Sequence, residues 1–163
     1  FPKSLTPYQG SLSKSTTTDC FITKINTNAS GATSLAYSTY IGGSSNDQCY
    51  GIDVDTANPP NAYVTGQTFS TNFPAKSLST SNRGTSDAFV VKLNPTGSAL
   101  AYSVFVGGSA DDAGFAIAVD SANQAYVTGK TTSTNFPKAN AFQTKQNAFS
   151  HGYKGAMFPW EMS

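Results

Sequence analysis

The sequence predicts an all-β fold made of tandem copies of one short-stranded unit, and three observations support this prediction. One block of residues occurs twice, as Ala62–Gly66 followed by Ser70–Pro74 and as Ala125–Gly129 followed by Ser133–Pro137. Short stretches rich in β-branched and aromatic residues recur at regular spacing, divided by Gly, Asn, Asp and Pro. Glu occurs only once, and strong helix formers do not gather in runs. Such a repeat indicates that each copy is a structural unit.

The expected strands follow the same order in the two copies. The first copy is expected to form strands at Cys20–Asn26, Leu35–Ile41, Tyr50–Asp55 and Ala62–Thr68, and the second at Asp87–Asn94, Leu100–Val106, Phe115–Asp120 and Ala125–Thr131. Ser44–Gln48 is expected to be a polar loop, and the copies differ in length only at turns, as a packed scaffold tolerates. The pattern is typical of a sandwich, a barrel or a propeller. Apolar residues on both faces of the strands favour stacked blades.

Composition excludes several classes of function. Charged residues make up 12% of the chain, the formal net charge is +1, and the basic residues are scattered. This argues against a nucleic-acid or membrane-surface patch. No apolar run reaches the ~20 residues of a membrane span, and no signal peptide is recognisable. A surface of Ser, Thr, Asn and Gln suits an extracellular or cell-surface protein. The start at Phe1, without an initiator Met, indicates a processed chain or a piece of a longer one.

Several linked motifs resemble a known family. They are Asp87–Gly97, Tyr102 to Gly107-Gly108-Ser109, Ile117–Asp120 and Ala125–Gly129. Together they are similar to the bacterial β-propeller repeat, SBBP, over roughly residues 19–143. The resemblance implies antiparallel four-stranded blades in a secreted or cell-surface protein, with no general catalytic residues. It also implies that Phe115–Asp120 is the first strand of a blade and Leu100–Val106 the last strand of the preceding one.

By this resemblance the chain holds a half blade (Cys20–Ile41), a whole blade (Tyr50–Val106) and a second half (Phe115–Thr131). A propeller needs about four to eight blades to close. The predicted fold is therefore a set of propeller-like blades too few to close a propeller within one chain.

The two cysteines, Cys20 and Cys49, replace Ala88 and Gly114 of the other copy. In a blade the first and third strands run the same way, so we expect both residues to fall at the same end of one sheet. We expect a Cys20–Cys49 disulfide, with two buried thiols as the alternative.

Two segments have no expected place in the blades: an N-terminal arm or loop, residues 1–18, and an apolar C-terminal tail, residues 144–163. The tail departs from the repeat pattern and holds the aromatic and Met side chains that we expect to make assembly contacts, Phe149, Tyr153, Met157, Phe158 and Trp160. We expect the tail to pair with an edge strand of another copy, or else to fold back on its own blade.

The remaining candidate sites have simpler alternatives. The acidic loops that hold Asp47, Asp111 and Asp112 could bind Ca²⁺ through oxygen ligands, although these aspartates equally suit capping of backbone amides in tight turns. No other cofactor is expected. Asp53 and Asp55 are spaced as a carboxylate pair might be, but Asp53 becomes Ala118 in the other copy. Asn28 begins a glycosylation sequon.

Three functions from different classes remain. The first is a non-enzymatic extracellular structural subunit that assembles with copies of itself into a filament or ring. The second is an adhesion or ligand-binding module, a fragment of a larger secreted propeller whose partner is a glycan or a surface protein. The third and weakest is an enzyme using Asp53 and Asp55. A lone histidine, His151, excludes His-based triads.

Overall fold

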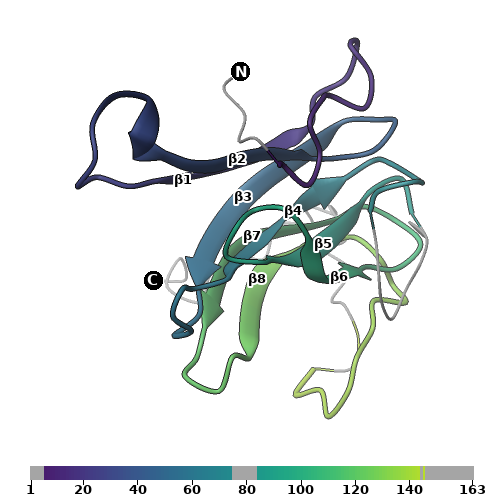
Figure 1. The fold of residues 1–163 in the computed structure, drawn as a ribbon. Helices are drawn as coiled ribbons and strands as arrows, with labels where there is room; N and C mark the ends of the chain where they lie inside the picture. The colour runs from purple at the N-terminus through teal and green to yellow at the C-terminus, as the bar shows by residue number, and fades with distance from the viewer. Residues whose placement is uncertain (1–5, 75–83, 144, 146–163) are drawn as a thin grey trace, which may run out of the picture.

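The computed structural model describes residues 6–74, 84–143 and 145, and in them eight strands form three separate antiparallel sheets (Figure 1). The sheets are β1 (Cys20–Ile25) with β2 (Leu35–Ile41); β3 (Asp47–Val54), β4 (Ala62–Thr68), β5 (Asp87–Leu93) and β6 (Leu100–Val106); and β7 (Asp112–Val119) with β8 (Ala125–Thr131). One 3₁₀ turn, Gly31–Ser34, precedes β2.

The middle sheet is a whole blade with the strand order β3-β4-β5-β6, and the predicted all-β architecture of incomplete blades is confirmed. By the repeat alignment, β1–β2 corresponds to β5–β6, and β7–β8 corresponds to β3–β4. The described residues therefore form the outer half of one blade, one complete blade and the inner half of another. None of these sheets closes on itself.

The two middle strands of the complete blade, β4 and β5, are buried on both faces, as the two-sided apolar pattern predicts. Every residue of β4 is buried, and Phe89, Val91 and Leu93 of β5 are fully buried. These three side chains belong to a core that Ile22, Tyr37 and Ile41 of the first half blade also enter. On the opposite side, β7 packs along β3 and β4. The described part contains no helix of the length and apolarity that a membrane crossing would need.

Two strands begin earlier than predicted, because each continues through a β-bulge. β3 starts at Asp47 rather than Tyr50, and β7 at Asp112 rather than Phe115. The register shifts between Cys49 and Gly51, and again at the equivalent place in β7. The partner residue is Gly66, where a Cβ would overlap the carbonyl oxygen of Gln48. Glycine is therefore required opposite the bulge.

The recurring sequence blocks interlock at the double-glycine turns. Gly43 N–H donates to Asp47 Oδ2 at 2.7 Å, and Ser70 Oγ donates to the same oxygen at 2.8 Å. Asn72 Oδ1 accepts from the N–H of Ser44 at 2.7 Å. The second copy repeats these contacts with the residues Gly108, Asp112, Ser133, Ser109 and Asn135. The Gly-Gly-Ser and Ser-Thr-Asn motifs are thus two sides of one hydrogen-bonded turn.

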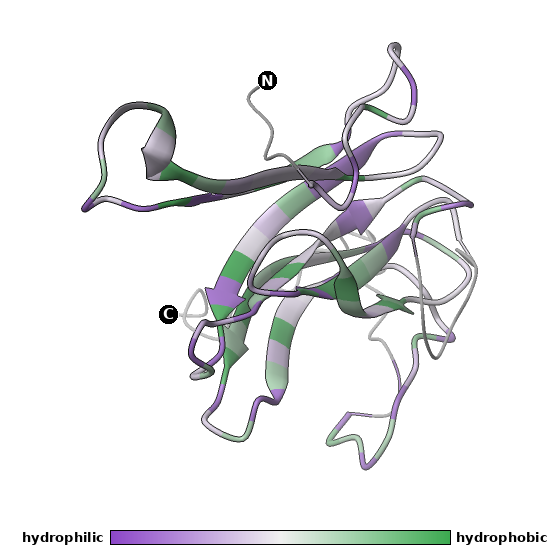
Figure 2. Cartoon of the chain, in the orientation of Figure 1, coloured by the Kyte–Doolittle hydropathy of each residue, from purple (hydrophilic) through white to green (hydrophobic). Residues whose placement is uncertain are grey.

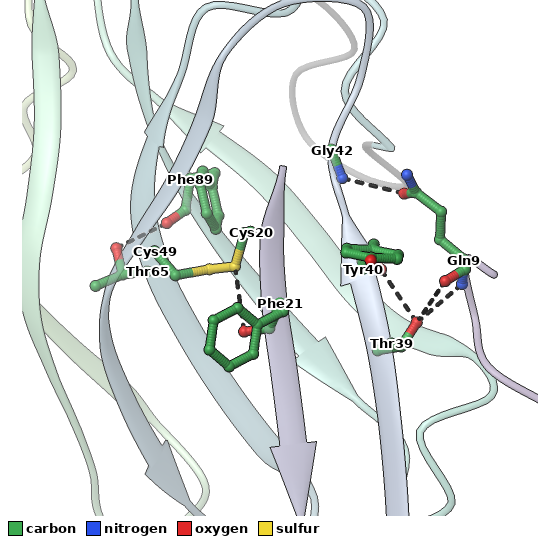
Figure 3. Close-up of a disulfide and its surroundings, with 9 residues drawn as sticks. All are labelled: Gln9, Cys20, Phe21, Thr39, Tyr40, Gly42, Cys49, Thr65 and Phe89. Atoms are coloured by element: carbon green, nitrogen blue, oxygen red, sulfur yellow. Dashed lines mark hydrogen bonds between the residues drawn. A yellow bond between two sulfur atoms is a disulfide. The ribbon is translucent and has the colours of Figure 1, made fainter. Parts of the chain in front are cut away.

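The Cys20–Cys49 disulfide is confirmed, but it does not lie within one blade. Cys20 lies on β1 and Cys49 on β3, with Cα atoms 5.4 Å apart (Figure 3). The expectation of one shared sheet was wrong, because the chain passes from the fourth strand of one blade to the first strand of the next between the two residues. The bond therefore links the half blade to the complete blade.

The described part of the N-terminal arm has a place on its own half blade. Gln9 N–H donates to Thr39 Oγ1 at 2.9 Å, and Gln9 O accepts from Tyr40 N–H at 3.2 Å. Gln9 Oε1 accepts from Gly42 N–H, as Figure 3 shows. The arm therefore lies along β2, contrary to the expectation that it has no place in the blades.

Removing the disulfide by the double change Cys20→Ala and Cys49→Gly should lower the free energy of unfolding by about 3 kcal/mol, as expected for a loop of this length. The two replacements are those of the second copy, Ala88 and Gly114. Urea unfolding measures the loss. Thiol titration of denatured, unreduced wild-type protein should find no free thiol, and two free thiols would contradict the bond.

Candidate functional site: the open blade edges

In the complete blade, three polar side chains join the β3–β4 turn to β5. Lys92 Nζ lies 3.1 Å from Asp55 Oδ2 and 4.8 Å from the ring centre of Tyr63. Asp55 Oδ1 accepts from the N–H of Asn61 at 2.9 Å, so Asp55 has a structural role in the turn. We call Asp55, Tyr63 and Lys92 the blade triad; it ties the inner half of the blade to the outer half.

The contacts of the blade triad strongly affect the ionisation of Asp55. Burial alone would raise the pKa of Asp55, but hydrogen bonds from the backbone and side chain of Asn61 and from Lys92 outweigh burial and lower the pKa to about 2. The Asp55 side chain is almost inaccessible, while that of Lys92 is 22% exposed. The charged form of Asp55 therefore stabilises the fold.

The same three positions are divided between the two half blades. Lys24 on β1 corresponds to Lys92, while Asp120 and Tyr126 of the β7–β8 hairpin correspond to Asp55 and Tyr63. Tyr126 OH donates to Asp120 Oδ2 at 3.1 Å, and Asp120 Oδ1 accepts two turn amides. The described residues offer Lys24 no ion pair. We did not predict this division, although aligning the copies reveals it.

The first open surface is the free edge of β1 together with the adjoining face of β3. Phe21 and Ile52 are each 58% exposed, and Ile25 and Val54 are also more than half exposed. A hollow of about 280 Å³ lies between these strands, lined by Phe21, Ile22, Thr23, Cys49, Tyr50, Gly51, Ile52 and Val64. In the complete blade the equivalent of Phe21 is Phe89, which is fully buried. This surface is where the inner half of the first blade would lie.

The second open surface is the free edge of β8 with the groove beside it. Six of the seven β8 residues are exposed, and Tyr126 is 61% exposed. A groove of about 540 Å³ separates β8 from the outer strands of the complete blade. It is lined by Tyr63, Val90, Lys92, Tyr102, Val104, Val106, Asn123, Ala125 and Val127. Figure 2 shows apolar residues in these strands. The outer half of the last blade would fill this groove.

Two segments of the chain, residues 36–74 and 103–137, match the family described as the beta-propeller repeat. Both segments are similar to that repeat. The first matched segment contains most of β2 together with β3 and β4, and the second contains part of β6 together with β7 and β8. Each match therefore begins in the last strand of one blade and continues into the first two strands of the next. No curated protein in the comparison matches the chain.

The aspartates of the proposed calcium loops have other partners in the described residues. Asp47 and Asp112 accept the turn amides and serine hydroxyls given above, and Asp111 Oδ1 accepts from Ser86 Oγ at 3.1 Å. Burial raises the pKa of Asp47, with a further contribution from the nearby Asp19 carboxylate. No group of three possible metal-binding residues occurs in the described ranges. These contacts fit the capping alternative, and calcium binding stays a prediction.

The carboxylates of Asp53 and Asp55 face different partners rather than each other. Asp53 Oδ2 accepts from the N–H of Val119 on β7 at 2.7 Å, whereas Asp55 binds Asn61 and Lys92. Asp53 therefore links neighbouring blades, a role that sequence reasoning missed. Asn28 is exposed to solvent. Glycosylation at its sequon stays a prediction. The expected assembly residues, Phe149 to Trp160, and His151 lie outside the described residues.

Replacing Asp55 by Asn should destabilise the protein by about 2 kcal/mol at neutral pH, which is the value of a pKa lowered from 3.8 to about 2. Because folding lowers this pKa, the contribution is complete above pH 4 and is lost as the pH falls toward 2. Urea unfolding of both proteins between pH 7 and pH 2 should show the two stabilities converging at acid pH. The control, Asp120→Asn in an exposed turn, should cost less. Parallel curves for wild type and Asp55→Asn would contradict the assignment.

Calcium removal tests the acidic loops directly. If Ca²⁺ is bound at Asp47, Asp111 or Asp112, adding EDTA should lower the melting temperature, because a ligand that binds only the folded state stabilises it. Added CaCl₂ should then restore the original value. An unchanged melting temperature would leave these aspartates with their turn role alone.

Proposed function

We propose that the chain is a non-enzymatic, extracellular structural subunit whose two half blades are completed by neighbouring copies. The observation that supports this most is their complementarity: β1–β2 corresponds to the outer half of the complete blade, and β7–β8 to its inner half. Each open surface also leaves large apolar side chains in solvent: Phe21 and Ile52 at the first and Tyr126 at the second. Burial of such side chains, at ~1.5–3 kcal/mol each, favours association.

The complementary halves lead to head-to-tail contacts between copies. One copy supplies a whole blade and two halves, the equivalent of two blades. Because propellers close with about four to eight blades, a closed ring would contain roughly two to four copies. If the rotation between copies does not close, the same contact gives a filament.

The extracellular part of the proposal rests on the disulfide and on the composition. Disulfides persist in oxidising compartments, and small domains of secreted proteins use them widely.

The non-enzymatic part of the proposal rests on the two aspartates that could have formed a catalytic pair. Asp53 and Asp55, the candidate catalytic pair, are each engaged by structural partners.

A second candidate is a ligand-binding or adhesion module within a larger secreted propeller. The match to a propeller repeat favours it as well, because further repeats of a longer chain would complete the same two edges. A glycan or surface protein would then be the partner. The two candidates differ in the behaviour of the 163-residue chain: a subunit assembles, whereas an isolated fragment stays monomeric and is unstable.

The first test is the mass of the 163-residue chain as its concentration rises. Light scattering coupled to size exclusion should show multiples of the monomer mass, and negative-stain images should show rings or filaments. A constant monomer mass at all concentrations would contradict self-assembly and favour the second candidate. Deleting residues 148–163 then separates two routes: assembly through the blade edges survives the deletion, whereas assembly through the tail does not.

A further inference from the structure

We propose that β8 of one copy pairs antiparallel with β1 of the next, in the register of β4 with β5, and that Lys24 thereby completes a blade triad with Asp120 and Tyr126 of the first copy. The inference rests on the proposed self-assembly and adds the contact that produces it. It names the blade edges, rather than the tail, as the joining elements.

The register follows from the intact blade. There Tyr63 lies opposite Lys92, Val64 opposite Val91, and Thr65 opposite Val90. Replacing each residue by its equivalent in the half blades places Tyr126 opposite Lys24, Val127 opposite Thr23, and Thr128 opposite Ile22. The strands have compatible lengths, and each has one free edge.

The charges at the two edges are complementary in this register. In the intact blade Asp55 Oδ2 accepts from both Asn61 Nδ2 and Lys92 Nζ. The equivalent oxygen of Asp120 accepts from Tyr126 OH, which leaves it able to accept a second donor. Lys24 of the next copy would supply that donor and lie over the Tyr126 ring, as Lys92 lies over Tyr63.

The apolar surfaces are complementary as well. Within the chain, Phe89 and Leu93 of β5 share one core with Ile22, Tyr37 and Ile41 of the preceding half blade. Across the proposed junction, Phe21 and Ile25 hold the positions of Phe89 and Leu93. The groove beside β8 is lined by the equivalents of the other three residues, namely Val90, Tyr102 and Val106. The exposed side chains of β1 therefore fit the groove that lacks a strand.

One position needs a local adjustment. A Cβ at Gly114 would overlap Thr65 Oγ1, and Cys49 takes the place of Gly114 in the first copy. At the junction, Cys49 of one copy would meet Thr128 of the other, so the Thr128 hydroxyl must turn away. The conflict involves the end of a short side chain and leaves the backbone ladder intact.

Charge reversal gives the decisive experiment. Lys24→Glu and Asp120→Lys should each weaken assembly of the full chain by roughly tenfold or more, since each places like charges together. An equimolar mixture of the two variants should assemble again, because every junction then joins opposite charges. Lys14→Glu is the control: it makes the same charge change at an exposed residue outside both strands and should assemble as wild type does.

Cross-linking tests the register independently. Thr23→Cys and Val127→Cys, purified separately, mixed and mildly oxidised, should give a disulfide-linked dimer that retains the native Cys20–Cys49 bond. Thr23→Cys mixed with Thr128→Cys should give little disulfide-linked dimer, because neighbouring residues of a strand point to opposite faces of the sheet.

The outcomes separate this pairing from the broader proposal. A wild-type chain that is monomeric at all concentrations overturns both. Assembly that is unaffected by Lys24→Glu, together with the absence of a Thr23–Val127 cross-link, overturns the β8–β1 pairing while self-assembly stands. Assembly that is lost in both variants but not recovered in their mixture overturns the pairing as well. Loss of assembly on deletion of residues 148–163 would identify the tail as the joining element and would likewise overturn this pairing.

Discussion

The constraint on which the structure depends is that a blade with two apolar faces needs a neighbour on each side. The pentapeptide Ala-Tyr-Val-Thr-Gly shows this directly, because it occurs in both β4 and β8. In β4 all of its residues are buried, and in β8 all are exposed. Identical residues thus differ in burial only through the strands and blades around them. Within the described residues, the two half blades leave this requirement unmet at two places.

The turns show how the repeat keeps its blades in register. Asp47 holds the Gly43 amide and the Ser70 hydroxyl, so it fixes the loop before β3 to the segment after β4. The second copy makes the same contacts at the same distances to within about 0.1 Å. A Cβ at Gly43 would come within 2.6 Å of Ser70 Cβ and Asn72 Oδ1. Glycine, aspartate and serine recur together because each is needed by the others.

The strand order and most strand bounds could be predicted from the sequence. The hydrophobic pattern and the turn residues are local signals, and both occur in each copy of the repeat. The bulges could not, because they depend on Gly66 and Gly129 approaching the backbone of a partner strand. The cysteine pair was predicted, but its position between two blades is a property of how the sheets stack. The role proposed for Lys24 was missed for a similar reason. It follows from the ion pair of the equivalent residue, Lys92, with Asp55, which only the structure shows.

The two blade contacts within the chain each have a link that the second copy of the repeat lacks. Cys20 and Cys49 join the first half blade to the complete blade, and Asp53 accepts from the Val119 amide on the other side. In the second copy Ala118 replaces Asp53, so a neighbour stacked on β7 would receive no equivalent carboxylate. Contacts between copies would then rest on strand pairing, apolar burial and the Lys24 ion pair alone. The proposed junction would lack the covalent bond and the carboxylate link that join the blades inside the chain.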